Sequence, residues 1–119
     1  MHGLLKSFEY ARNGAAAAWR TEMNFRIEIA AAAFVLGAAY FLNISWMETA
    51  VCLFAIGLVI VAELFNTAIE ELSDIVQPDH HPKIATVKNV SAAAVLCASI
   101  VAVGVGCIVF IPYVIAFVP

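Results

Sequence analysis

Residues 63–74 read Glu63-Leu64-Phe65-Asn66-Thr67-Ala68-Ile69-Glu70-Glu71-Leu72-Ser73-Asp74, at the end of a long apolar run. If this run is a helix, positions i, i+3, i+7 and i+11 share one face within an arc of about 80°. Those positions hold Glu63, Asn66, Glu70 and Asp74. Stacked like charges beside hydrocarbon are costly, so we expect a proton, a metal ion or a basic partner to neutralise them.

The composition is that of an integral membrane protein. The chain has 119 residues, of which 64% are hydrophobic and 13% charged, and its mean hydropathy is +0.95. A soluble domain is nearer half apolar and a quarter charged, and a chain this short cannot bury so much apolar surface in its own core. The net charge of −3 says little about partners, and nothing in the sequence suggests nucleic acid.

The hydropathy pattern predicts an all-α membrane protein, with residues 1–119 as one domain. An amphipathic surface helix is expected first, although a helix packed on protein would show the same pattern. Three membrane helices should follow, with Arg26 and Glu28 as interfacial residues of the first. The expected ranges are about 4–23 for the surface helix and 26–42, 47–76 and 88–111 for the membrane helices. A polar loop bounded by prolines precedes the last of them.

The basic residues predict the orientation of the chain. All six lie in the N-terminal segment or in the loop before the third span: Lys6, Arg12, Arg20, Arg26, Lys83 and Lys88. Because cytoplasmic loops carry an excess of Lys and Arg, we expect the N-terminus in the cytoplasm and the C-terminus outside.

Depth in the bilayer separates the polar residues. Glu48 marks the outer end of the second span, and Glu63 lies about 22 Å further along the helix axis. A hydrocarbon core of about 30 Å then places Glu63 just inside the cytoplasmic boundary. Glu22 and Lys88 belong to the same layer. A lipid hydroxyl could reach this layer from one side and a soluble anionic substrate from the other.

This layer holds the groups that phosphoryl transfer needs, which are metal-binding oxygens, positive charge and an oriented nucleophile. Mg²⁺ commonly takes one or two carboxylates plus substrate phosphates. Glu63 at the lipid rim suits a general base, and Lys88 could stabilise phosphate charge. Two other functions fit the same residues. One is a non-enzymatic subunit that handles cations or protons, and the other is a scaffold assembled through a stripe of small residues in the third span.

The motifs resemble those of the small prokaryotic diacylglycerol kinases, a family that includes the undecaprenol kinases. The matching segments are Glu63-Leu-Phe-Asn66-Thr-Ala-Ile-Glu70-x-x-x-Asp74, His81-Pro82, Lys88-Asn89-Val-Ser-Ala-Ala-Ala-Val-Leu96, Ser7-Phe8-x-Tyr10-Ala11-x-x-Gly14 and Glu22-x-Asn24-Phe25-Arg26-Ile27. The resemblance implies a homotrimer in the bacterial inner membrane, with active sites shared between protomers. It also implies Mg²⁺-dependent transfer of the ATP γ-phosphate to undecaprenol or diacylglycerol.

The resemblance further implies roles for single residues. Glu63 matches the catalytic base, while Glu22 and Glu70 match the metal-binding glutamates. Asn66 and Asp74 match polar positions of the site. The nucleotide positions are Tyr10, His81 and Lys88, with Asp79, His80 and Asn89 beside them. Asn89 stands where the family usually has Asp. It keeps a hydrogen-bonding oxygen but loses the charge, so a degenerate kinase is a further alternative.

Overall fold

Residues 2–119, which the computed structural model describes, form four α-helices. They are α1 (His2–Thr21), α2 (Met23–Leu42), α3 (Trp46–Val76) and α4 (Pro82–Ala116). Three of them, α2, α3 and α4, are long and apolar enough to cross a membrane. The predicted all-α membrane architecture is therefore confirmed, with a separate N-terminal helix ahead of three candidate spans.

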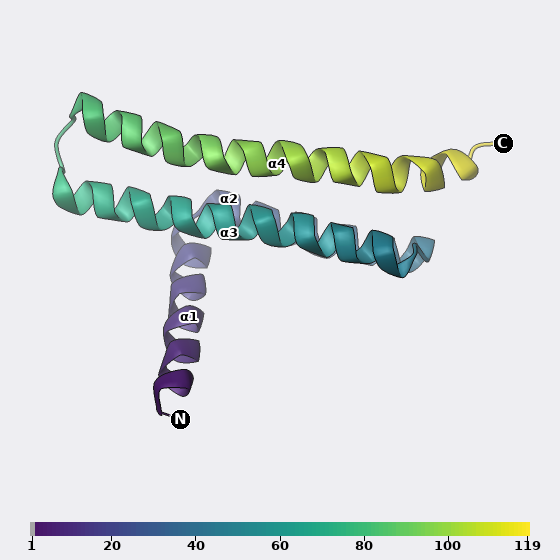
Figure 1. Ribbon diagram of the computed structural model, residues 1–119, viewed down its shortest axis with the longest axis horizontal. Coiled ribbons are helices and arrows are strands. Elements are labelled where there is room, and N and C mark those ends of the chain that lie inside the picture. Colours follow the sequence, from purple (N-terminus) through teal and green to yellow (C-terminus); the bar gives the residue numbers. More distant parts are fainter. Residues whose placement is uncertain (1) are drawn as a thin grey trace.

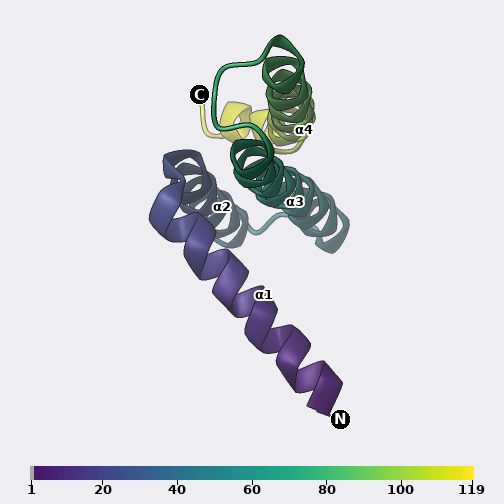
Figure 2. The same cartoon turned by 90° about the vertical axis from the view of Figure 1, so that its left-hand side faces the viewer.

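The three membrane helices lie side by side, and α1 leaves them at a steep angle (Figure 1). Viewed along the bundle, α3 lies between α2 and α4 (Figure 2), and it packs against both. The α3 and α4 helices run antiparallel, joined by a short connection at the end of the bundle where α3 finishes (Figure 1). Because α3 is central, residues on its inner faces can meet side chains from two neighbouring helices.

Large apolar side chains cover the outside of this bundle. Phe34 on α2, Phe54 on α3 and Ile108 on α4 are each more than three-quarters exposed. In water such a surface would drive aggregation, whereas hydrocarbon accepts it without cost. The chain is thus a multi-pass membrane protein whose apolar residues face outward as well as inward.

The ends of α4 lie outside the predicted range of 88–111. The helix begins at Pro82, where a proline is tolerated because the N–H of the first turn would lack a helical partner. His81 precedes it as the N-cap, and its Nδ1 accepts a hydrogen bond from the Lys83 backbone N–H at 3.1 Å. At the other end the helix continues through Pro112 to Ala116. The loop before α4 is therefore shorter than expected.

The buried face of α3 changes character along its length. Its first half buries small or apolar residues, whereas its second half buries polar ones. The buried residues are, in order, Cys52, Ala55, Val59, Glu63, Asn66 and Ser73. The spacing of three, four or seven keeps them on one face of the helix. The transition falls at Glu63, where the candidate site begins.

Candidate active site

Glu63 is the most deeply buried polar residue in residues 3–119. Its exposed fraction is 1%, and it is the one large side chain of this region below 2%. Its Oε2 atom is buried without a hydrogen-bond partner among the described residues. A buried carboxyl oxygen without a partner is costly, so such groups are rare in structural roles. This oxygen is therefore the first candidate for contact with a substrate.

Glu28 on α2 faces Glu63 from across the bundle, a pairing that the sequence did not predict. The two carboxyl groups lie close enough to influence each other electrostatically. The Oε2 atom of Glu28 is also buried without a partner in the described chain. Glu22 and Glu70 lie close enough to repel Glu63 as well. Carboxylates this close repel each other unless a proton or a cation lies between them.

A hydrogen-bonded chain crosses from α4 to α3 beside this cluster. The Ser91 hydroxyl donates to Oδ1 of Asn66 at 2.7 Å, and both residues are buried. The Nδ2 atom of Asn66 in turn donates to Oε1 of Glu70 at 3.4 Å. Asn66 thus links a serine on α4 to Glu70, a carboxylate predicted to bind a metal ion. Ser91 was not among the predicted site residues.

One turn further along α3, an ion pair connects the same two helices. Nζ of Lys88 lies 2.5 Å from Oδ1 of Asp74. Glu70 lies near enough to attract the same ammonium group. Asn89, the next residue, is exposed. The structure therefore places Lys88 and Asp74 together, next to Glu70, with Asn89 outside the pair.

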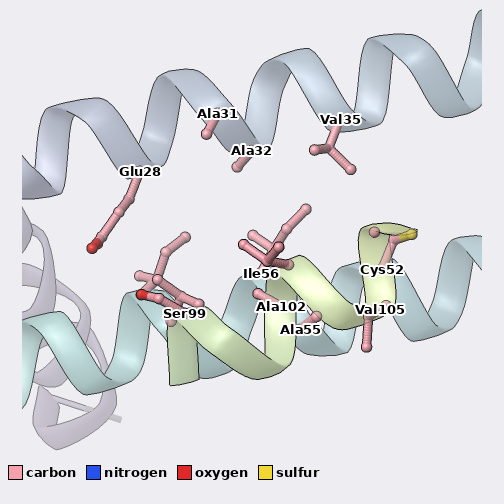
Figure 3. A pocket seen from close by; sticks show the side chains of 14 residues that line it. Glu28, Ala31, Ala32, Val35, Cys52, Ala55, Ile56, Ser99, Ala102 and Val105 are labelled. Atoms are coloured by element: carbon pink, nitrogen blue, oxygen red, sulfur yellow. The ribbon is translucent and has the colours of Figure 1, made fainter. Parts of the chain in front are cut away.

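An apolar cavity of about 320 Å³ begins one turn from Glu63 and lies between α2, α3 and α4. Glu28 extends from α2 at one end of it, while Cys52 and Val105 lie at the other end (Figure 3). Small side chains such as Ala32 and Ala102 line its middle. The cavity therefore joins the paired carboxyl groups to an apolar space within the membrane bundle.

The remaining predicted residues lie away from this cluster. Tyr10 on α1 is 67% exposed, and Asp79 and His80 are exposed in the loop between α3 and α4. His81 caps α4, which is a structural role. Within residues 2–119, no side-chain hydrogen bond or ion pair connects any of these four to Glu63.

No group of three or more His, Cys, Asp or Glu side chains in the described part of the chain is arranged to hold a metal ion. The predicted metal residues Glu22 and Glu70 both lie near Glu63. They offer carboxylate oxygens from two elements, at the start of α2 and on α3. An ion held here would need further ligands from a substrate or from water.

Known proteins resemble this chain over most of its length. The family model for prokaryotic diacylglycerol kinase matches residues 9–110. An undecaprenol kinase from Bacillus subtilis is 33% identical over 112 residues, which cover 94% of this chain and 91% of that protein. A diacylglycerol kinase from Escherichia coli is 32% identical over 105 residues, covering 88% and 86%.

A longer diacylglycerol kinase from Synechocystis is 38% identical over 110 residues. This chain spans 63% of its length. The match with the family model includes Glu22, Glu63, Glu70 and Lys88, all of which lie within residues 9–110. The chain therefore belongs to the prokaryotic diacylglycerol kinase family, a family of lipid kinases.

Proposed function

We propose that this protein transfers the γ-phosphate of ATP to the hydroxyl group of a membrane lipid alcohol, undecaprenol or diacylglycerol, with Mg²⁺. The observation that carries the proposal is the unpartnered, buried oxygen of Glu63 beside an apolar cavity. The hydroxyl of a lipid alcohol could donate a hydrogen bond to this oxygen, while the apolar chain of the same lipid occupies the cavity. The cytoplasmic interface is the level at which such a lipid and ATP can meet.

Glu63 acts as the general base in this reaction. The lipid hydroxyl donates a hydrogen bond to the Glu63 carboxylate and transfers its proton there as the lipid oxygen attacks the γ-phosphorus. A new oxygen–phosphorus bond forms, the bond from the γ-phosphorus to the oxygen that bridges it to ADP breaks, and ADP leaves. Because protein does little covalent work in phosphoryl transfer, the rate depends on positioning and on charge stabilisation.

Lys88 supplies positive charge to the phosphate groups. Its ammonium group is held by Asp74 at 2.5 Å and lies near Glu70. An ammonium at a fixed position stabilises charge that develops on the transferring phosphate. The ion pair keeps Lys88 on the α3 side of α4, where the cluster of carboxylates lies.

The donor set around Glu63 fits Mg²⁺. This ion prefers oxygen ligands and usually binds through one or two carboxylates, substrate phosphates and water. Glu22 and Glu70 are the residues that would hold it, and bound Mg²⁺ would neutralise charge on the ATP phosphates. The absence of a closed metal cluster within residues 2–119 is compatible with an ion whose other ligands come from ATP.

The active sites are shared between the protomers of a homotrimer. Support comes from Tyr10, which matches a nucleotide-contacting position, and from Asp79 and His80, which lie beside such positions in the sequence. All three are exposed and away from Glu63 within one chain. A neighbouring protomer could present these residues to the cluster. The large apolar surface of the bundle also leaves area for contacts between protomers.

The protein would lie in the bacterial inner membrane with its N-terminus in the cytoplasm and its C-terminus outside. The distribution of Lys and Arg supports this orientation. It places the Glu63 cluster on the side where ATP is available.

The test is a phosphorylation assay on protein reconstituted in lipid nanodiscs with radiolabelled ATP and Mg²⁺. One arm contains undecaprenol, a second contains diacylglycerol, and a third contains neither. We expect a labelled lipid in one of the first two arms and none in the third. A family member of known activity serves as the positive control. If that control works and this protein labels neither lipid, the proposal is wrong, and Asn89 would then be examined as the mark of a degenerate kinase.

A further inference from the structure

Ser91 is buried at the contact between α4 and α3, and the catalytic steps above do not use it. Its exposed fraction is 7%, and that of Asn66 is 8%. The 2.7 Å hydrogen bond between them is short and joins two side chains 25 positions apart in the sequence. Buried side-chain hydrogen bonds of this kind are uncommon, since most side-chain bonds go to backbone or water.

This bond determines which way the Asn66 amide points. An asparagine side chain has an acceptor oxygen on one side and a donor NH₂ on the other. With Oδ1 bound to the Ser91 hydroxyl, the NH₂ group faces Glu70 and donates to its Oε1. The reversed amide would turn Oδ1 toward the Glu70 carboxylate, and two acceptors would then repel each other.

Glu70 is sensitive to this arrangement because its own hydrogen bond is long. At 3.4 Å, the distance from Asn66 Nδ2 to Glu70 Oε1 exceeds the usual range for such a bond. A small rotation of the amide would break it. Ser91 lies three residues after Lys88, so both residues face α3 and hold it at adjacent turns.

We propose that Ser91 is a positioning residue for the metal-binding carboxylate Glu70. Its hydroxyl holds the Asn66 amide so that Oε1 of Glu70 receives a hydrogen bond, which leaves Oε2 of Glu70 to bind a divalent cation. This inference rests on the proposed function, in which Glu70 helps to hold Mg²⁺. Groups that orient metal ligands in this way are worth about ten- to a hundredfold in metal affinity.

The test measures Mn²⁺ binding to protein in nanodiscs saturated with a non-hydrolysable ATP analogue, by electron paramagnetic resonance, with Mn²⁺ as the probe for Mg²⁺. We compare wild type with Ser91→Ala, and with Thr86→Val as the matched control. Thr86 lies on the same helix, is exposed, and its hydroxyl donates to the Pro82 backbone oxygen at 3.1 Å. We expect Ser91→Ala to raise the Kd for Mn²⁺ about tenfold or more, and Thr86→Val to leave it unchanged.

Kinetics give a second measurement that separates positioning from a general loss of structure. In Ser91→Ala the half-saturating Mg²⁺ concentration should rise while the KM for the lipid stays as in wild type. Circular dichroism checks that helix content is retained. Ser91→Cys keeps a side chain of similar size with a poor hydrogen-bond donor, so it should weaken Mn²⁺ binding in the same direction.

Two failures are distinguishable. If wild type phosphorylates lipid and binds Mn²⁺, and both Ser91 variants bind Mn²⁺ equally well, the role of Ser91 is wrong and the proposed function stands. If wild type neither phosphorylates lipid nor binds Mn²⁺, the proposed function itself fails.

Discussion

The start of α3 and its second half each carry a glutamate that meets side chains of a neighbouring helix, but the hydrogen-bonding environments of the two carboxyl groups differ. At the start of the helix, Oε1 of Glu48 accepts hydrogen bonds from the Ser45 backbone N–H at 3.2 Å and from the Tyr113 hydroxyl at 2.6 Å. About four turns later, Glu63 is almost fully buried and its Oε2 has no partner in the described chain.

This difference matches a structural role for Glu48 and the proposed catalytic role for Glu63. Glu48 completes a capping box with Ser45 and ties the start of α3 to the end of α4, so its hydrogen-bonding capacity is used by the fold. Glu63 lies among other carboxyl groups, and its Oε2 atom has no hydrogen-bond partner in the described chain. A buried carboxyl oxygen without a hydrogen-bond partner breaks the usual rule for folded proteins, and such exceptions are expected at functional sites. The comparison predicts that changes near Glu63 cost activity, whereas changes near Glu48 cost stability.

The largest effect should come from Glu63→Gln. Glutamine keeps the shape of the side chain but cannot accept the proton of the lipid hydroxyl, so we expect the rate of lipid phosphorylation to fall by about 10²- to 10⁴-fold. The matched control is Glu71→Gln, an exposed glutamate on the same helix, which should retain wild-type activity. A Glu63→Gln rate within tenfold of wild type would remove Glu63 from the role of base.

Lys88→Met should have the next largest effect. It removes the ammonium group that we propose stabilises the phosphates, and we expect the rate to fall by about 10²-fold. Asp74→Asn leaves the ammonium in place and only loosens it, so the loss should stay within about fivefold, as is usual for exposed ion pairs.

The control for this pair is Lys83→Met, since Lys83 is an exposed lysine in the first turn of α4. Steady-state rates at varied ATP concentration would make the comparison. If Lys83→Met and Lys88→Met lose the same activity, general charge at the interface and not the position of Lys88 explains the effect.

Near the start of α3, where Tyr113 of α4 contacts Glu48, Tyr113→Phe should affect stability and leave catalysis intact. The variant deletes the hydroxyl that donates to Glu48, so the thermal unfolding midpoint in detergent should drop by a few degrees. Activity at lower temperature should stay within about twofold of wild type. Tyr40→Phe, at a tyrosine that is 90% exposed on α2, is the control and should change neither quantity. A large loss of activity in Tyr113→Phe with an unchanged midpoint would contradict the division between the two ends.

The sequence predicted the helices and one side of the site, because both depend on local patterns. Apolar runs of membrane-spanning length identified α2, α3 and α4. Helical spacing placed Glu63, Asn66 and Glu70 on one face, and the structure has two of these buried and the third half-buried. Such arguments need only the geometry of a single helix.

The missed residues depend on how the helices are rotated against each other. Glu28 was interpreted as an interfacial residue because it lies near the start of a span, yet its carboxyl group faces Glu63. Ser91 looked like one more small residue of α4, yet it binds Asn66. Hydropathy gives no information on the register between two packed helices. The available signal for Glu28 was its place between two isoleucines. A charged residue in an apolar segment is costly, which is the argument that identified Glu63.

The smallest effect should come from Asn89→Asp, although the family motif makes this the most conspicuous departure of the chain. Position 89 lies about 100° around the helix from Lys88, and Asn89 is exposed. Lys88 already has a carboxylate partner in Asp74, so a new one at 89 would stand in solvent and change the rate by no more than about twofold. The measurement is the phosphorylation rate of both Asn89→Asp and the Asn89→Asp, Asp74→Asn double variant. A gain of tenfold or more in either would show that residue 89 acts in a site completed by a neighbouring protomer, and the contrast between the two ends of α3 would then extend beyond one chain.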